Sequence, residues 1–377
     1  MGLPRSQYVQ EGQVGVYHCF SRCVRRAFLC GIDPQTRNDY SHRKTWLVDK
    51  LRELAAIFAV EVCAFAVMWN HYHTILRTRP DIVATWSDYE VASRWLTLFP
   101  RHCDLGQVPI DKQIHALTQS PGRIATLRKR LSSLSWFMGR LNESIARAAN
   151  KEDKVKGRFW ESRFKCQVLL DEAAIAACMV YVDLNPIRAG LAGTPEESDF
   201  TSIQERIRAW QNATMSTAPI PRKKMPNIQS VSNHGDTLMT DNNGKIPNHI
   251  PGVSVTNDPL DTVVSNHWLC PISPEIHRCG ILSMTEAEYF DLVDKSGRII
   301  HSDKQRAIDA DLAPILRRIG VNPETWTETI SRFGSKFHLA AGLLSNLRNF
   351  ANQLSKRWFV GIGSARATFA LIPPRLA

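Results

Sequence analysis

The sequence has no apolar run that approaches the roughly 20 residues of a membrane-spanning helix, so we expect no membrane partner. Its first residues also lack an apolar stretch behind a basic tip, the pattern of a secretory signal. Paired cysteine spacing is missing as well. The nine cysteines are an odd number, and several, such as Cys63 and Cys178, lie in apolar segments where a small buried thiol is the ordinary interpretation. We therefore expect a reducing, cytoplasmic setting.

Acidic residues are also in short supply. The chain has 47 Lys and Arg against 36 Asp and Glu, a formal net charge of +11, which suits a polyanionic partner or simply a soluble surface. The surplus is concentrated between residues 123 and 165, where aromatic residues are interleaved. Cations for phosphates and flat side chains for unstacked bases are what single-strand binding requires, although a solvated helix face over an ordinary core has a similar composition. We predict DNA contacts at Arg128, Lys129, Arg130, Arg158, Arg163 and Lys165.

Local patterns predict alternating strands and helices over the first half of the chain. Residues 60–68 are expected to form a buried strand and 72–78 its partner, because the two-residue step Trp69-Asn70 suits a tight turn. Asp171 is a good N-cap, and Asn185-Pro186 ends the helix that it begins, because the residue before a proline avoids the helical region. The other expected elements are strands at 14–21 and 164–170 and helices at 41–59, 86–98, 123–150 and 171–184.

These elements predict an α+β fold over residues 1–210, with helices packed over one small sheet. Between 211 and 262 the composition changes to Pro, Asn, Ser and Thr with few large apolar residues, which predicts a disordered linker. Residues 263–377 are expected to form a small helical accessory domain. Its basic residues suit contact with DNA or protein, and equally an ordinary surface. A chain that ends near residue 211 is therefore expected to fold alone.

Two histidines follow the predicted turn. In a strand, residues i and i+2 project to the same face, so His71 and His73 can grip one cation from a rigid platform. The apolar strand before them places this platform in the sheet. The alternative is that the two histidines simply fill polar edge positions.

Tyr181 and Asn185 lie one helical turn apart and so share a face. A phenol has a pKa of about 10 and is a poor nucleophile at neutral pH, unless a cation polarises the group that it attacks. Asn185 is suitably placed to add its carbonyl to the ligands of such a cation. The alternative is that Tyr181 packs into the core and Asn185 caps the end of the helix.

In combination, these segments resemble a known family. His71-Tyr72-His73 resembles the HUH motif, meaning histidine, a large residue and histidine. Tyr181 with the segment from Asn185-Pro186 to Leu191 resembles the Tyr-x-x-x-Asn-Pro-x-x-Ala-Gly block of the REP-associated tyrosine transposases, which are single-tyrosine insertion-sequence transposases. Residues 157–164 (GRFWESRF) and 17–22 (YHCFSR) match the segments that these proteins carry before the tyrosine helix and in the first strand.

The resemblance implies a ferredoxin-like α+β sandwich with the HUH site on a central antiparallel sheet. His71, His73 and Asn185 would hold Mg²⁺ or Mn²⁺, which would polarise the scissile phosphate. Tyr181 would attack that phosphate, leaving a 5′-phosphotyrosine and a free 3′-OH that can attack back without ATP. The implied activity is a transposase that cuts and rejoins single-stranded DNA beside a hairpin. The implied partner is that DNA, and a homodimer is left open.

The chain departs from the family pattern in two places. Trp69 stands where proline is frequent, and the segment from 98 to 123, like everything after residue 210, has no counterpart in minimal members. Two other functions stay open. A non-catalytic nucleic-acid-binding protein on the same fold leaves the histidine pair and the tyrosine helix unexplained. A replication initiator or relaxase-type nickase uses the same chemistry, but often carries two tyrosines or a third metal histidine in another order, a pattern not found in this sequence.

Overall fold

The computed structural model describes residues 3–24, 29–33, 36–100, 109–216, 268–273, 280–301 and 312–369. The chain falls into two units, residues 1–208 together with 268–377, and residues 209–267. The predicted linker at 211–262 lies outside the described residues except at its start, where helix α9 (Ser202–Ser216) continues past the predicted boundary. None of the helices in the described ranges is long and apolar enough to cross a membrane.

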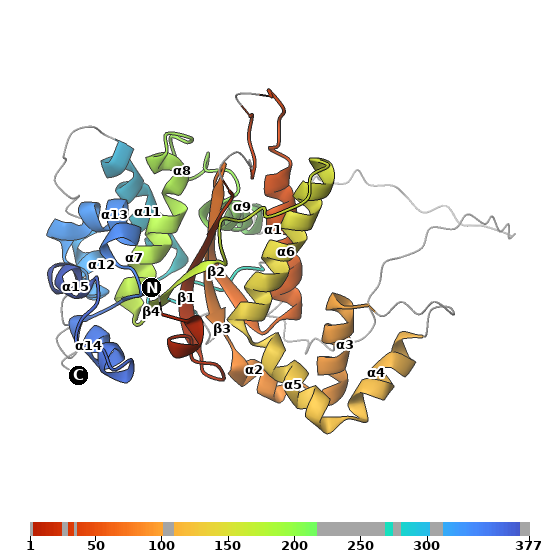
Figure 1. Cartoon of the computed structure of the whole chain (residues 1–377). Coiled ribbons are helices and arrows are strands. Elements are labelled where there is room, and N and C mark those ends of the chain that lie inside the picture. The colour runs from red at the N-terminus through yellow and green to blue at the C-terminus, as the bar shows by residue number, and fades with distance from the viewer. Residues whose placement is uncertain are drawn as a thin grey trace, which may run out of the picture. The chain divides into compact units, whose positions relative to one another are not determined.

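A five-stranded sheet forms the centre of the first unit (Figure 1). Its strands follow the order β2-β3-β1-β4-β5, and neighbours are antiparallel except for β4 and β5, which are parallel. The strands are β1 (Gly15–Arg22), β2 (Val60–Val67), β3 (His71–Thr78), β4 (Lys165–Leu169) and β5 (Ala340–Ala341). The fold is thus a mixture of helices with a mostly antiparallel sheet, and the first four strands lie close to the ranges that the sequence predicts.

The hairpin of β2 and β3 forms where it is predicted. The interior side chains of β2 are fully buried, as expected for a strand that is covered on both faces. The amide of Met68 donates to the carbonyl of His71 over 2.8 Å and closes the two-residue turn Trp69-Asn70. This turn fixes the register of the hairpin, and the register decides which side chains of β3 face each way.

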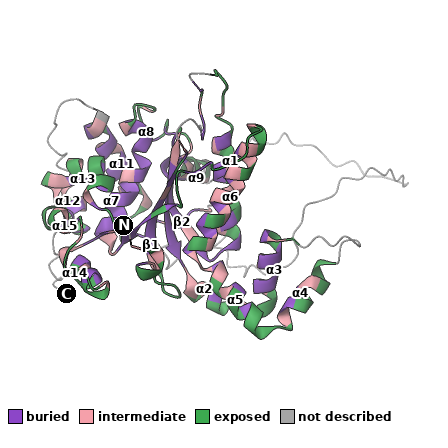
Figure 2. Ribbon diagram, viewed as in Figure 1, coloured by how far each residue is buried: buried purple, intermediate pink, exposed green. Residues whose placement is uncertain are grey.

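Helices cover both faces of this sheet (Figure 1). Helices α1 (Arg43–Ile57) and α6 (Leu134–Glu152) pack together on one face, and α7 (Glu172–Asp183) lies on the other. The alternation of β3 follows these layers: the hydroxyl of Tyr72 donates to Asn142 of α6 over 2.8 Å, whereas His73 faces α7. Figure 2 shows the resulting core as buried residues along the sheet and on α7.

The single helix predicted at 123–150 is wrong, because α5 ends at Leu131 and α6 begins at Leu134. Ser132 and Ser133 occupy the break, and serine side chains compete with the helical backbone for hydrogen bonds. The carbonyl of Leu131 accepts from the amide of Ala59 over 2.9 Å, so a tertiary contact also holds the chain there. The other helices of this half are α2 (Pro80–Thr85), α3 (Asp88–Leu98), α4 (Ile110–Thr118), α5 (Pro121–Leu131) and α8 (Asn185–Arg188).

Helix α7 begins and ends as predicted. The side chain of Asp171 accepts from the amide of Ala174 over 3.1 Å and caps the helix. The helix ends at Asp183, just before Asn185-Pro186, and the chain continues into α8. Nearly all of its side chains are buried, but Tyr181 near its C-terminal end is only half-buried.

The described residues after 268 complete the same compact unit. The hydroxyl of Tyr289 donates to the buried carboxyl of Asp183 over 2.6 Å. The amide of Cys270 donates to the carbonyl of Val62 over 2.8 Å, at the outer edge of β2. The separate role predicted for residues 263–377 stays a prediction, although these contacts join them to the sheet and to α7. Their helices are α11 (Glu286–His301), α12 (Leu312–Arg318), α13 (Trp326–Lys336), α14 (Leu344–Gln353) and α15 (Ile362–Thr368).

Candidate active site

The two predicted metal-binding histidines lie where β3 begins. His71 and His73 share the face of the sheet that α7 covers, with their ring centroids 5.0 Å apart. In the sheet register, Arg22 of β1 is opposite His71 and Phe20 is opposite His73. His73 is 6% exposed, whereas His71, at the end of the strand, is half-buried. The sheet therefore buries the ring of His73 and leaves the ring of His71 partly exposed at the end of the strand.

Helix α7 brings Tyr181 to the same histidines. The ring centroid of Tyr181 lies 5.9 Å from that of His73, and the two ring planes are nearly perpendicular at 85°. The guanidinium of Arg188, from α8, lies 4.0 Å from the centroid of the Tyr181 ring, which is a cation–π contact. Side chains of β3, α7 and α8 thus meet at one place.

Helix α13 lies against Tyr181. The ring of Phe333 packs 5.8 Å from the Tyr181 ring. Gly334 leaves room for the hydroxyl, because a Cβ at this position would lie 3.1 Å from the Tyr181 oxygen. The carbonyl of Ile330 accepts from Arg188 over 3.0 Å, so the same helix also holds the cation that contacts the ring. Residues beyond the predicted linker therefore position the predicted nucleophile.

Asn185 belongs to this cluster, but its amide is already bonded. Its nitrogen donates to the carbonyls of Tyr181 and Val182, each over 3.3 Å, as expected of a residue that caps a helix C-terminus. Its Oδ1 accepts from the guanidinium of Arg188. The oxygen that is predicted to bind a metal ion therefore already accepts one hydrogen bond from a cationic side chain, and its role as a ligand stays a prediction.

His18 of β1 is a third histidine in the cluster, and it is absent from the site residues predicted from the sequence. Its Nε2 lies 2.9 Å from Nδ1 of His73, and the two ring planes differ by 20° with centroids 5.1 Å apart. Its Nδ1 lies 3.3 Å from Oε1 of Gln167 on β4. A single histidine in an apolar strand carries no local spacing signal. Only the position of β1 between β3 and β4 reveals its partners.

Burial keeps the three histidines uncharged at neutral pH. Desolvation lowers the pKa of His18 and of His71 to about 4, and the positive charge of Arg188 contributes to both shifts. Desolvation also moves the pKa of His73 well below its usual value, with His18 and His71 adding to the shift. Neutral imidazole is the form of histidine that binds metal ions.

The donor atoms of the histidine pair fit a divalent cation. Nδ1 of His71 lies 2.6 Å from Oδ1 of Asn70 and Nδ1 of His73 contacts His18, whereas neither Nε2 forms a hydrogen bond with a described residue. Metal-binding histidines usually have such a partner on the other ring nitrogen. Two imidazoles do not complete a coordination shell, and no cluster of three or more His, Cys, Asp or Glu side chains suited to a metal ion occurs within the described ranges. Oxygen atoms of water and substrate are the ordinary further ligands of Mg²⁺.

A basic hollow adjoins the histidines and contains two of the predicted DNA contacts. The hollow has a volume of about 170 Å³ and is lined by Phe20, Ser21, Arg22, Glu161, Ser162, Arg163 and Lys165. The exposed side chains of Arg22 and Arg163 form no hydrogen bond or ion pair with any residue that the structure describes. Lys165 is also exposed, and its Nζ lies 5.6 Å from the centroid of Phe20. With Glu161 as its one acidic lining residue, the hollow is positively charged.

The other predicted DNA contacts have different surroundings. The guanidinium of Arg128 donates to the carbonyl of Trp86 over 2.7 Å and pairs with Asp88 over 2.8 Å, so it joins α5 to α3. The guanidinium of Arg130 lies 4.5 Å from the centroid of Trp136. Lys129 and Arg158 are exposed. DNA contact at all four of these residues stays a prediction.

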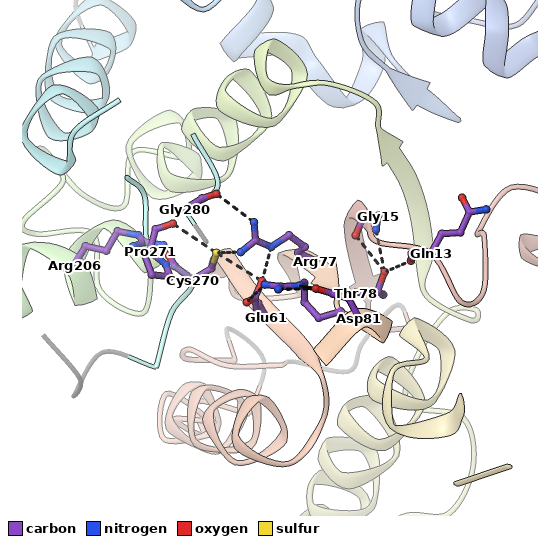
Figure 3. A network of polar contacts seen from close by, with 11 residues as sticks. Gln13, Gly15, Glu61, Arg77, Thr78, Asp81, Arg206, Cys270, Pro271 and Gly280 are labelled. Carbon is purple, nitrogen blue, oxygen red and sulfur yellow. Dashed lines mark hydrogen bonds and ion pairs between the residues drawn. The ribbon is translucent and has the colours of Figure 1, made fainter. Parts of the chain in front are cut away.

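Arg77 near the far end of β3 and Arg79 just beyond it have the same spacing as the histidine pair, and Figure 3 shows the contacts around Arg77. Arg77 and Arg79 both form ion pairs with Glu61 of β2. Arg77 also donates to the carbonyl of Gly280 over 3.3 Å and contacts Sγ of Cys270 at 3.1 Å. Arg77 therefore holds the segment around Cys270 to the sheet.

No protein-family model matches this chain, and no curated protein matches it. Among solved structures, the chain is similar to a REP-associated tyrosine transposase bound to a REP hairpin. The identity is 11%, the match covers 64% of this chain and 100% of that chain, and the TM-score is 0.32. The similarity between the two structures is distant.

Proposed function

We propose that this protein is a metal-dependent, single-tyrosine DNA transposase that cuts and rejoins single-stranded DNA beside hairpins. The observation that carries this proposal is the meeting of Tyr181 with the histidine pair, at 5.9 Å between the rings of Tyr181 and His73. The sequence singles out these residues separately, and they come from β3 and α7. Residues with only a packing role would not be expected to gather at one partly exposed position.

The arrangement of the sheet supports the finer part of the proposal, a ferredoxin-like sandwich. The first four strands lie in the order β4-β1-β3-β2, and α1 and α6 pack together on one face. A β-α-β-β-α-β chain path of this kind is typical of that fold. The histidine pair and Tyr181 lie on the opposite face, beside α7, and the basic hollow next to them is where DNA would lie.

In the proposed reaction, the hydroxyl oxygen of Tyr181 attacks the phosphorus of a phosphodiester and becomes bonded to it. The bond from phosphorus to the 3′ oxygen of the leaving strand breaks, the phenol gives up its proton, and the 3′ oxygen ends as a hydroxyl. Because the tyrosine ester replaces one phosphate ester by another, attack by a 3′-OH reverses the step and joins strands without ATP.

The histidine pair, Arg188 and the basic hollow each have a part in this proposal. His71 and His73 would hold a divalent cation, which supplies Lewis-acid polarisation of the phosphate when bound. The guanidinium of Arg188 holds the Tyr181 ring in place. The basic hollow would bind the phosphates next to the scissile one, and Phe20 offers a flat apolar surface for an unstacked base.

The two alternative functions, a non-catalytic nucleic-acid-binding protein and a nickase, require different residues from those of this proposal. A protein that only binds nucleic acid would use the basic hollow and have no need for Tyr181. A nickase with three metal histidines would need a third histidine ligand. Among the described residues, His18 is the third histidine beside this pair, but its Nε2 is bonded to His73. The geometry therefore favours the single-tyrosine transposase with two histidine ligands.

The test is a covalent adduct. The full chain is incubated with a labelled hairpin oligonucleotide and Mn²⁺, and the products are separated under denaturing conditions. We expect an adduct that peptide mass spectrometry assigns to Tyr181 and that is missing in Tyr181→Phe and in chelator. Tyr89→Phe is a matched control, because Tyr89 is an exposed tyrosine of α3 and its loss should leave the adduct unchanged. An adduct on another residue, or full activity in chelator, would contradict the proposal, and DNA binding without any adduct would favour the non-catalytic alternative.

A further inference from the structure

A chain of buried hydrogen bonds connects the residues after α13 to His73. The backbone carbonyl of Phe337 accepts from Nε2 of Gln167. Oε1 of Gln167 lies 3.3 Å from Nδ1 of His18, and Nε2 of His18 lies 2.9 Å from Nδ1 of His73. Gln167 is 3% exposed and His18 is 1% exposed, so water has little access to these bonds. We call the Phe337 carbonyl, Gln167 and His18 the relay.

Only one placement of the protons satisfies every bond in the relay. A carbonyl can only accept, so Phe337 requires the amide nitrogen of Gln167 and turns the amide oxygen toward His18. That oxygen also accepts, so the proton of His18 lies on Nδ1 and its Nε2 is a lone pair. This lone pair requires a proton on Nδ1 of His73. Since a neutral imidazole carries one proton, Nε2 of His73 is left as a lone pair.

We propose that the relay groups are positioning groups that fix His73 as its Nδ1–H tautomer and keep its Nε2 ready to bind a cation. The importance of this tautomer for DNA cleavage rests on the proposed function, whereas the tautomer itself does not. The relay begins at a carbonyl 170 positions beyond Gln167, so the C-terminal residues act on the site through the backbone.

The simpler explanation is that these polar groups are bonded only because buried polar groups must be. The two explanations predict different results when one member is removed. A structural role affects stability alone. A positioning role also changes the tautomer of His73, and loss of such an outer partner typically costs roughly 10–100-fold in metal affinity.

The tautomer is measured first in the unaltered full chain, without metal or DNA. The protein is labelled with ¹⁵N-histidine, and long-range ¹H–¹⁵N correlation spectra at neutral pH distinguish protonated from unprotonated ring nitrogens. The signals of His73 are identified by their absence in His73→Asn. We expect a protonated Nδ1 and an unprotonated Nε2 for both His18 and His73. An Nε2–H tautomer of His73 would overturn the proposal.

Gln167→Leu removes the relay at nearly constant volume. We expect the ¹⁵N shifts of the two His73 nitrogens to move toward each other, as both tautomers become populated, and Mn²⁺ affinity to fall by roughly 10–100-fold. Gln204→Leu is the matched control, because Gln204 is also buried and its Nε2 donates to the carbonyl of Glu196 over 2.8 Å, outside the relay. This control should lose stability while it keeps the His73 spectrum and Mn²⁺ binding. If both variants lose only stability, Gln167 is a structural residue and the proposal fails.

Failure of the proposed function would look different. If the unaltered chain forms no DNA adduct, but the His73 tautomer is as expected and changes in Gln167→Leu, the relay stands and the transposase proposal falls. If the adduct forms and the tautomer does not respond to Gln167→Leu, the reverse holds. If Gln167→Leu does not fold, the spectrum of the unaltered chain decides alone.

Discussion

The two ends of β3 carry polar residues at the same spacing and use them differently. His71 and His73 at its start and Arg77 near its end project to one face, because their positions differ by even numbers. Arg79 follows just beyond the strand and binds the same carboxylate as Arg77. At the arginine end, the carboxylate of Glu61 binds both side chains. At the histidine end, each ring has a partner on one nitrogen and no described partner on the other. The same i, i+2 spacing thus joins parts of the fold in one place and forms a candidate site in the other.

The two ends also differ in the property that a substitution should change, which is stability at one end and chemistry at the other. The arginine end contains charges that are removed from water, so the free energy of unfolding depends on their partners. The histidine end contains neutral rings whose lone pairs point in fixed directions, so the chemistry depends on their geometry. Substitutions at the two ends should therefore affect different measurements.

The largest effect is expected at the histidine end. His73→Ala should lower the rate of hairpin cleavage by about 10³-fold, because Lewis-acid polarisation is worth several kcal/mol and each 1.36 kcal/mol is tenfold in rate. Its thermal midpoint should fall by a few degrees only. Single-turnover cleavage, corrected for the folded fraction, measures the effect. A variant at the arginine end that slowed cleavage as much would remove the distinction between the two ends.

At the arginine end the effect should be on stability. Arg77→Met leaves Glu61 with one partner fewer and should lower the free energy of unfolding by about 2–4 kcal/mol, while cleavage per folded molecule is unchanged. Urea titration measures this. Arg298→Met is the control, because Arg298 forms an exposed ion pair with Asp294 one turn away and should leave the midpoint unchanged. Equal midpoints for the two variants would show that the network around Arg77 does not stabilise the fold.

A buried acid on α7, Asp183, makes the stability of the fold depend on pH. Burial raises the pKa of Asp183 to about 6, against hydrogen bonds from Ser202 and Tyr289 that lower it. The folded chain therefore binds this proton more tightly than the unfolded chain does. The contribution of Asp183 to stability is full below its ordinary pKa of 3.8 and is lost as the pH rises through about 6.

Asp183→Asn should remove this contribution. As the pH falls from 7 to 4, the free energy of unfolding of the unaltered chain should increase relative to that of the variant, by at most roughly 1.4 kcal/mol per pH unit. Denaturant titrations of both proteins at each pH measure the difference. The buried histidines act in the opposite direction, but they titrate in both proteins and cancel. A difference that does not change with pH would contradict the prediction.

The smallest effect concerns the salt dependence of DNA affinity. Replacing Arg163 and Lys165 by alanine should flatten the slope of log affinity against log salt by about 0.7 for each phosphate of a single strand that is no longer neutralised. Replacing Arg52 and Arg298 removes the same charge from side chains that form ion pairs with Asp49 and Asp294 and are not among the predicted DNA contacts, so the slope should stay as it is. Fluorescence anisotropy with a labelled single strand measures both slopes. Equal flattening would mean that the basic hollow has no special role in binding DNA.

Most of the first half of the fold can be predicted because its signals are local. The apolar run of β2, the turn at Trp69-Asn70 and the cap at Asp171 are each encoded within a few residues, and all three are confirmed. The break between α5 and α6 is missed because the apolar spacing continues across it: Leu131 and Leu134 are both buried. A pattern of burial alone does not reveal where the backbone leaves the helix.

In the candidate site, too, the features encoded by local spacing are predicted and those that depend on distant parts of the chain are missed. The spacing of His71 and His73 predicts that they share a face, and they do. His18 and Gln167 are missed because each is a single polar residue in an apolar strand, and their meaning depends on a neighbour that comes from elsewhere in the chain. The bond from Arg188 to the predicted metal ligand is local by contrast, because Asn185 lies three positions earlier in α8. The roles predicted for the site residues stay predictions.

The carbonyl of Phe337 has a consequence for how the relay would be inherited. Since the group belongs to the backbone, a change of side chain at this position leaves it in place as long as β5 pairs with β4. One inserted or deleted residue between Lys336 and Ala340 would instead turn the carbonyl away from Gln167. Descendants of this gene should therefore keep the length of this short connection more strictly than its composition, apart from the buried side chain of Phe337.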